Sequence, residues 1–233
     1  MKQIVAMGGG GFLMENTPLL DDFILSRAKG RESRVCFIAT ASGDSDRMLV
    51  TFYTALGSRC RADHLPLFRR SATDVAAYLL NQDVIYVGGG NTANLLALWR
   101  LHGVDRALVQ AYEAGIVLCG VSAGALCWFE AGVTDSFGSL DGLENGLGIL
   151  KGSFCPHFDG EPLRRPAYRR LIAEGMQSGF AADDGAAMCF VDGALAEVVT
   201  SRPSARAYRV GPVDGALREE ALPSRYLGGM SST

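Results

Sequence analysis

Three short apolar segments of this 233-residue chain run directly into glycine turns. They are residues 3–7 (QIVAM) before Gly8–Gly11, residues 83–87 (DVIYV) before Gly88–Gly90, and residues 116–119 (IVLC) before Gly120. A segment with helical character follows each turn. Apolar strands that end in tight turns and alternate with helices are typical of a parallel sheet that is covered on both faces.

Longer amphipathic segments lie between the apolar ones. We expect helices over residues 18–29, from Ser45 or Asp46 to near Gly57, from Thr73 to Leu80, over 92–101 and over 104–114, and further strands over 34–39 and 60–67. Thr17 is a candidate N-cap of the first helix, and Pro18 suits its first position. The sequence therefore predicts a three-layer α/β fold, in which helices cover both faces of a mostly parallel sheet.

The C-terminal third follows a different pattern. Residues 186–199 and 205–211 predict short strands with a turn at Asp192-Gly193, which indicates an antiparallel β addition. We find no internal repeat and no linker. We therefore expect a single domain over residues 1–222 and a loose tail over residues 223–233.

The composition excludes several classes of partner. The net charge of −3 lacks the basic excess of a dedicated nucleic-acid-binding protein. No apolar run reaches the roughly 18 residues of a membrane span, and residues 1–7 are too short for a signal-peptide core. The six cysteines are scattered without a C-x-x-C pair, which favours reduced thiols over zinc or disulfides. We expect a cytoplasmic protein without nucleic-acid, membrane or metal partners, with a homodimer as one alternative for its assembly.

The residues Gly120-Val121-Ser122-Ala123-Gly124 match the G-x-S-x-G pattern of a nucleophile elbow. Because an apolar strand precedes them and a helix-forming segment, Ala123–Phe129, follows, we expect Ser122 on a tight turn at the carboxyl end of a central strand. The helix N-terminus would there direct N–H groups at a developing oxyanion. The alternative is a serine that caps the helix of an ordinary strand–helix turn.

A serine nucleophile needs a general base, and the chain has three histidines. His64 lies within a strand-like segment, and His102 follows the end of a helix. His157 lies downstream of the elbow among apolar residues. By elimination His157 is the best candidate base, and its alternative role is that of a hydrogen-bonded structural histidine.

Four acidic residues are candidates for orienting that base. Asp184 lies at a turn between two apolar segments, Glu130 and Asp135 precede His157, and Asp159 follows it by two residues. Acids at turns are also common as caps or solvated residues. The residue pattern alone leaves the choice among the four open.

The turn over residues 87–93 formally matches the dinucleotide-binding pattern G-x-G-x-x-A, which makes a nucleotide-binding domain one alternative. The pattern follows the fourth expected strand rather than the first, and the next strand ends at Cys119-Gly120 without an acid for a ribose. We therefore interpret Gly89 and Gly90 as backbone that approaches a substrate closely. The N–H groups of Gly90 and Ala123 would form an oxyanion hole.

Polar residues beside these turns are candidates for substrate binding. Asn91 and Thr92 would contact substrate or cap the following helix. Arg165 and Arg169 belong to a cluster of four arginines after His157, and their spacing of four places both on one face of a helix that begins near Pro166. An arginine there would bind a substrate carboxylate, and the alternative is a solvated helix face.

Together these segments resemble the peptidase E (dipeptidase E, aspartyl dipeptidase) family of serine peptidases and the related cyanophycinases. The resemblance extends from residue 1 to about residue 200 and rests on residues 88–92, residues 120–125, and Pro156-His157-Phe158 with the arginines that follow. It implies a fold like the class I glutamine amidotransferase domain, which is flavodoxin-like. It also implies serine hydrolysis of small peptides, often with an N-terminal aspartate, without a metal or organic cofactor.

Applied to this chain, the resemblance implies that Ser122 is the nucleophile and His157 the base. Cyanophycinase-like members carry the acid after the histidine, at the place of Asp184, whereas peptidase E carries it between serine and histidine, near Asp135. We expect a serine exopeptidase or dipeptidase that uses Ser122, His157 and Asp184. The alternatives are a cyanophycinase-like hydrolase, an amidase, or a non-catalytic amidotransferase-like module that binds a small molecule.

Overall fold

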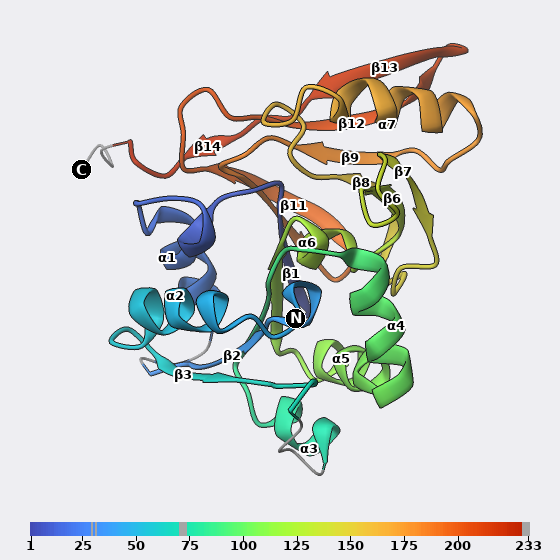
Figure 1. The fold of residues 1–233 in the computed structure, drawn as a ribbon. Coiled ribbons are helices and arrows are strands. Elements are labelled where there is room, and N and C mark those ends of the chain that lie inside the picture. The colour runs from blue at the N-terminus through green and yellow to red at the C-terminus, as the bar shows by residue number, and fades with distance from the viewer. Residues whose placement is uncertain (29, 31, 70–73, 230–233) are drawn as a thin grey trace.

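The structure is a computed structural model that describes residues 1–28, 30, 32–69 and 74–229. In these residues the strands form two sheets, one of eight strands and one of six (Figure 1). The first sheet has the order β14 (Arg225–Tyr226), β11 (Ala194–Thr200), β10 (Ala186–Val191), β1 (Gln3–Met7), β5 (Val117–Val121), β4 (Val84–Val87), β2 (Arg34–Ile38) and β3 (Arg61–His64).

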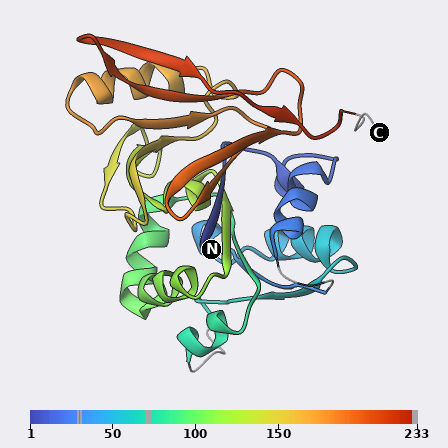
Figure 2. The same cartoon turned by 180° about the vertical axis from the view of Figure 1, so that it is seen from behind.

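The strands β1, β5, β4, β2 and β3 are mutually parallel and form the centre of the first sheet. Every residue of β1, β4 and β5 is buried, because helices cover both faces. One face carries α1 (Leu19–Arg27) and α2 (Asp46–Leu56), and the other carries α3 (Val75–Leu80), α4 (Thr92–His102), α5 (Val104–Glu113) and α6 (Ala123–Leu126). Figure 2 shows the same layers from behind. The predicted three-layer arrangement is confirmed.

Several predicted helix ends differ from those in the structure. Pro18 is the N-cap of α1 rather than its first residue. Among the residues that the structure describes, no side chain caps this helix, so Thr17 does not have the predicted role. Helix α6 ends at Leu126 instead of Phe129, because Phe129 begins a strand. Lys29, the predicted end of the first helix, and Thr73, the predicted start of the third, lie outside the described residues.

The predicted antiparallel addition extends the first sheet at β1. Strand β10 pairs antiparallel with β1, and β11 returns antiparallel to β10 through a turn at Asp192 and Gly193, both of which have positive φ. The two-residue strand β14 pairs with β11. The predicted tail over residues 223–233 thus includes a short strand that the sequence analysis did not foresee, and residues 230–233 are not described.

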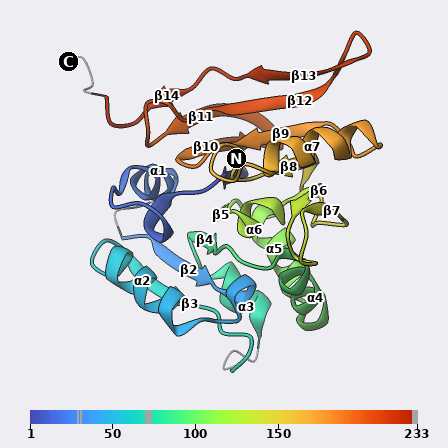
Figure 3. The same cartoon turned by 45° about the horizontal axis from the view of Figure 1, so that its top comes forward.

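The remaining strands form a second sheet, which was not predicted from the sequence. Its order is β13 (Ala216–Ala221), β12 (Ala207–Val213), β9 (Gly179–Ala182), β8 (Leu150–Cys155), β6 (Phe129–Thr134) and β7 (Asp141–Glu144). Strands β6, β8 and β9 are parallel, and the others pair antiparallel. Helix α7 (Arg164–Ala173) packs on one face of this sheet (Figure 3) through Tyr168 and Leu171.

The other face of the second sheet shares a core with the first sheet. Phe129 of β6 stacks on Phe154 of β8, with ring centroids 4.9 Å apart, and meets Phe190 of β10 at 5.7 Å. The turns that follow β8 and β9 come to the carboxyl end of β1, where Gly9 pairs with Asp184 and lies against His157. Turns from both sheets therefore meet at one place. No helix in the described ranges has the length and apolar composition to cross a lipid bilayer.

Candidate active site

Ser122 directly follows β5 and begins the turn into α6. Its backbone angles, φ 56° and ψ −117°, lie in a region that non-glycine residues rarely occupy. The Ser122 N–H donates to Met7 O at 3.1 Å, and Ser122 O accepts from the N–H groups of Ala125 and Leu126, both at 2.9 Å. In the described part of the chain, the Ser122 side chain makes no capping hydrogen bond to α6. The hydroxyl therefore does not act as an ordinary helix cap.

Two glycines of the G-x-S-x-G pattern allow this turn by close backbone contact. A Cβ at Gly120 would overlap Gly124 O, and a Cβ at Gly124 would overlap Val87 O at the end of β4. Any larger residue would push α6 away from the strands. The spacing of the glycines thus follows from how closely α6 packs on β5 and β4.

Backbone N–H groups beside Ser122 are available to a ligand. Gly89 lies against the serine, since a Cβ there would be 3.3 Å from Ser122 Cβ. Among the described residues, the N–H groups of Gly89, Gly90 and Ala123 have no hydrogen-bond acceptor. Gly90 has a φ of 137°, and a Cβ there would overlap Ala41 O. A ligand at the second glycine turn would therefore lie next to Ser122.

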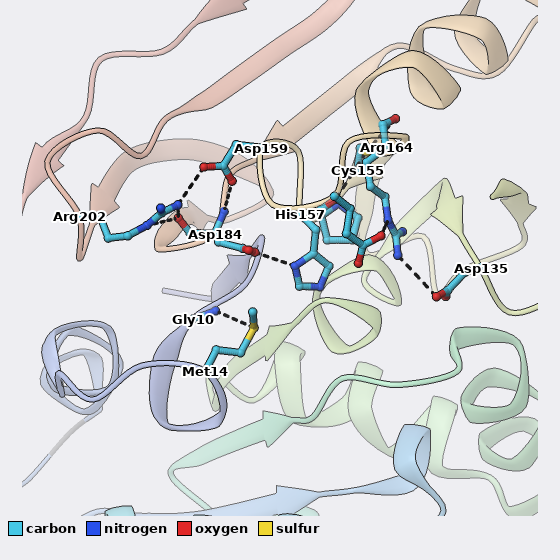
Figure 4. A network of polar contacts seen from close by, with 11 residues as sticks. Gly10, Met14, Asp135, Cys155, His157, Asp159, Arg164, Asp184 and Arg202 are labelled. Carbon is cyan, nitrogen blue, oxygen red and sulfur yellow. Dashed lines mark hydrogen bonds and ion pairs between the residues drawn. The ribbon is translucent and has the colours of Figure 1, made fainter. Parts of the chain in front are cut away.

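His157 and Asp184 form a close pair at the ends of β8 and β9. His157 Nδ1 and Asp184 Oδ1 are 2.6 Å apart, and the side chains are 12% and 25% exposed (Figure 4). The hydrogen bond from His157 is the main cause that holds the pKa of Asp184 below its ordinary value, against the opposing effect of burial. His157 has a φ of 53°, and its loop is anchored by the Phe158 N–H, which donates to Ala182 O at 3.1 Å.

Two glycines enclose the Asp184 carboxylate. A Cβ at Gly9 would overlap Asp184 Oδ1 and would be 2.9 Å from His157 Nδ1, and a Cβ at Gly160 would overlap Asp184 Oδ2. The Gly185 N–H donates to Gly9 O at 2.9 Å, which anchors the acid's turn to β1. Neither Gly9 nor Gly160 was assigned to the site from the sequence. The run Gly8–Gly11 after β1 was the sequence feature that could have indicated a close backbone approach at Gly9.

The serine and the His157–Asp184 pair each contact the chain at the carboxyl end of β1. The Ser122 N–H binds Met7 O, and two residues further along the chain Gly9 lies against the pair. No hydrogen bond joins Ser122 Oγ to His157 within the described ranges. Catalytic hydrogen bonds are often long before substrate binds. The arrangement can bring a hydroxyl, an imidazole and a carboxylate to one bound molecule.

The other three candidate acids have partners other than the imidazole. Asp135 is 3.8 Å from Arg164 Nη2. Glu130 accepts from Lys151 Nζ at 2.8 Å and from the Gly152 N–H at 2.9 Å. Asp159 accepts from the Asp184 N–H at 2.8 Å, and its second oxygen accepts from an arginine. Of the four candidates, the structure pairs Asp184 with His157.

The polar residues expected to bind substrate are engaged within the protein. Asn91 Oδ1 accepts from the Asn94 N–H at 2.9 Å and caps α4, and its Nδ2 donates to Ser136 O. Thr92 is buried. Arg165 and Arg169 share a face of α7, as predicted, but both bind Glu219 of β13. The two guanidinium groups therefore pair with a carboxylate of the protein.

The remaining sequence candidates lie elsewhere. His64 ends β3 and is 2.8 Å from Tyr53 Oη, and His102 is the last residue of α4. All six cysteines are free. Within the part of the chain that the structure describes, no three His, Cys, Asp or Glu side chains are grouped so that they could hold a metal ion.

Two solved structures share this fold. A peptidase from an acI-B1 Actinobacterium is similar in structure, with a TM-score of 0.71 at 17% identity, covering 96% of this chain and 95% of that one. A putative peptidase E protein from Listeria monocytogenes EGD-e is similar with a TM-score of 0.63 at 22% identity, covering 88% and 100%. The fold is class I glutamine amidotransferase-like, as the sequence predicted.

Sequence similarity then shows the family. The model of peptidase family S51 matches residues 4–198. A Bacillus subtilis (strain 168) protein named uncharacterized peptidase YgaJ is 52% identical over 231 residues, which cover 98% of this chain and all of the relative. The Listeria monocytogenes protein named uncharacterized peptidase Lmo0363 is 29% identical over 63% of this chain and 75% of its own length. The chain belongs to peptidase family S51, the peptidase E family, and is a peptidase.

Proposed function

We propose that the protein is a serine peptidase that hydrolyses small peptides through Ser122, His157 and Asp184. The 2.6 Å contact between His157 Nδ1 and Asp184 Oδ1, beside the strained turn at Ser122, carries this proposal. The family and its resemblance to peptidase E support small peptides as substrates, including dipeptides of the Asp-X type.

The first half of the proposed reaction forms an acyl-enzyme. With the proton on Nδ1 and hydrogen-bonded to the Asp184 carboxylate, His157 Nε2 is free to accept the proton of the Ser122 hydroxyl. Ser122 Oγ then forms a bond to the scissile carbonyl carbon, and the carbonyl oxygen becomes an oxyanion. The free N–H groups of Gly90 and Ala123 stabilise that oxyanion.

The second half releases the products. His157 returns its proton to the leaving amine as the peptide C–N bond breaks, which leaves the acyl group on Ser122 Oγ. A water molecule then gives a proton to His157 and attacks the acyl carbon. Release of the carboxylic acid returns the proton to Ser122.

A peptide panel combined with active-site labelling tests the proposal. The purified protein should hydrolyse unblocked Asp-X dipeptides in a panel with non-acidic dipeptides, blocked peptides and β-aspartyl-arginine. A fluorophosphonate should label wild-type protein but not Ser122→Ala, and that substitution should lower kcat by several orders of magnitude. Full peptidase activity in Ser122→Ala would contradict the mechanism.

Two isosteric substitutions separate the proposed acid from its alternative. Asp184→Asn should lower kcat by about four orders of magnitude, because an amide does not hold the imidazole in the required tautomer. Asp135→Asn, as the matched control, should lower kcat by less than about tenfold, since Asp135 contacts Arg164 instead of His157. The reverse order of losses at unchanged thermal stability would assign the acid to Asp135.

A further inference from the structure

The backbone of Asp184 lies in a closed ring of hydrogen bonds made by two charged side chains. Asp159 Oδ1 accepts from the Asp184 N–H at 2.8 Å. Arg202 Nε donates to Asp184 O at 2.9 Å, and Arg202 Nη2 donates to the same oxygen. Arg202 Nη2 also lies 2.9 Å from Asp159 Oδ2, which closes the ring (Figure 4).

This ring joins three segments that are far apart in the sequence. Asp159 lies in the loop that carries His157, Asp184 lies in the turn between β9 and β10, and Arg202 lies in the connection between β11 and β12. The ring therefore sets the distance between the loop of the base and the turn of the acid. A change in that distance would act directly on the His157–Asp184 contact.

The Asp184 carboxylate has little other polar support. In the described residues, His157 is the one group that donates a hydrogen bond to it. The backbones of Gly9 and Gly160 contact its two oxygens and restrict its plane, but they present no side chain that would hold it. The direction of the carboxylate thus depends on how the backbone of residue 184 is held.

Exposure alone would not suggest such a role for Asp159 and Arg202. Their side chains are 41% and 42% exposed, and an exposed ion pair of this kind contributes little to stability. The difference from an ordinary surface pair is that both side chains also bind the peptide groups of Asp184. Their effect should therefore be larger on the reaction rate than on stability.

We infer that Asp159 and Arg202 are positioning residues that hold the Asp184 backbone so that its carboxylate stays directed at His157 Nδ1. The inference rests on the proposed function, because it concerns the same acid. It gives Asp159, one of the candidate acids, a role that acts through Asp184.

Paired substitutions of Asp159 test the acceptor in this ring. Asp159→Ala leaves the Asp184 N–H without its acceptor and should lower kcat about tenfold to a hundredfold, since small misplacements of catalytic groups have effects of this size. The Asp159→Asn side chain still presents an acceptor and should keep kcat within about threefold of wild type. KM should change by less than about twofold in both, and the rate of fluorophosphonate labelling should follow kcat.

Substitutions of Arg202 test the donor. Arg202→Gln should lower kcat about tenfold, and Arg202→Lys should recover part of the loss, since an ammonium reaches one partner but does not form the fork. Arg61→Gln is the control, because Arg61 makes a two-nitrogen pair with Glu32 at the far edge of the first sheet. The Arg61→Gln variant should have wild-type kcat, and its melting temperature should change by a small amount similar to that of Arg202→Gln.

A double-mutant cycle separates failure of this inference from failure of the proposed function. In an Asp184→Asn background, Asp159→Ala should add little further loss, because the acid that it positions is already gone. Wild-type activity in Asp184→Asn would overturn the proposed function itself. An inactive Asp184→Asn variant together with wild-type kcat in Asp159→Ala, or a full multiplicative loss in the double variant, would overturn the positioning role alone.

Discussion

At the scale of single residues, Ser122 combines an unfavourable backbone conformation with close glycine neighbours. A non-glycine residue in a sparsely populated region costs about 1–3 kcal/mol and persists only when its surroundings hold it there. Hydrogen bonds to Met7 O and from Ala125 and Leu126 hold it here. The conformation directs Ser122 away from helix capping and places it beside the free N–H groups of Gly89 and Gly90.

Asp21 is a second unusual residue, on the α1 face of the first sheet. Its side chain is buried, and Tyr86 Oη donates to Asp21 Oδ1 at 3.4 Å. Burial raises the pKa of Asp21 to about 7, an effect that Arg59 opposes and Glu15 reinforces. The folded state therefore holds this proton more tightly than the unfolded chain does.

The Asp21→Asn variant should lose a specific pH dependence of stability. In the wild type, the stabilisation from protonated Asp21 is complete below about pH 4 and is lost as the pH rises through about 7. The variant should gain stability relative to wild type over this interval, by at most about 4 kcal/mol. Urea unfolding at pH 4, 6 and 8 measures the difference, and an equal difference at all three values would contradict the expectation.

At the scale of elements, the contact between α6 and the strands β4 and β5 positions the serine. Gly124→Ala would place a methyl group into Val87 O, so α6 must move away from β4. We expect a loss of about 1–3 kcal/mol in the free energy of unfolding and much slower labelling of Ser122. Gly229→Ala is the control, because its Cβ would be 3.6 Å from the nearest atom. Wild-type labelling in Gly124→Ala would show that the helix position is not important.

The elements of the first sheet could be predicted because each has a local signal. The strands β1 and β4 are short apolar runs that end directly before glycine, β5 continues through Gly120 to Val121, and α2 and α5 are amphipathic. The second sheet has weaker signals, since β6 begins only three residues after α6 ends and β8 includes Lys151 and Gly152. Its strands form through pairing with distant segments, such as Ser153 with Gly179, which local patterns do not reveal.

The candidate site was predictable in part for the same reason. Ser122 and His157 stand in recognisable local contexts, and each contacts the chain at the carboxyl end of β1. The choice of Asp184 depends on the strand order β9-β8-β6, which places Asp184 and Asp135 on opposite sides of the His157 strand. The pairing of Arg165 with Glu219 depends on a contact between residues 54 positions apart. Neither relation can be read from neighbouring residues.

At the scale of the whole molecule, the two sheets share one hydrophobic core. Phe154 of the second sheet is fully buried, and Phe129 and Phe190 join it in a cluster that includes both sheets. The sheet that carries the serine and the sheet that carries the histidine are thus packed together by apolar contacts. Stability and site geometry should therefore change together.

Phe154→Ala tests this coupling. The cavity should lower the free energy of unfolding by about 3–5 kcal/mol, with a single unfolding transition for both sheets and slower fluorophosphonate labelling of the folded protein. Phe137→Ala, at an exposed phenylalanine, should change stability by less than about 0.5 kcal/mol. Denaturant unfolding followed by fluorescence and circular dichroism measures both, and two separate transitions would contradict a shared core.

The convergence of two sheets at Gly9 has a consequence for biosynthesis. Ser122 leaves the ribosome before His157, and Asp184 follows later still, so a nascent chain that stops near residue 150 presents the hydroxyl without its imidazole. Under the proposed mechanism, such a fragment is inert toward peptide bonds. Hydrolytic competence would then appear only after Asp184 has been synthesised and the strands that carry His157 and Asp184 have docked.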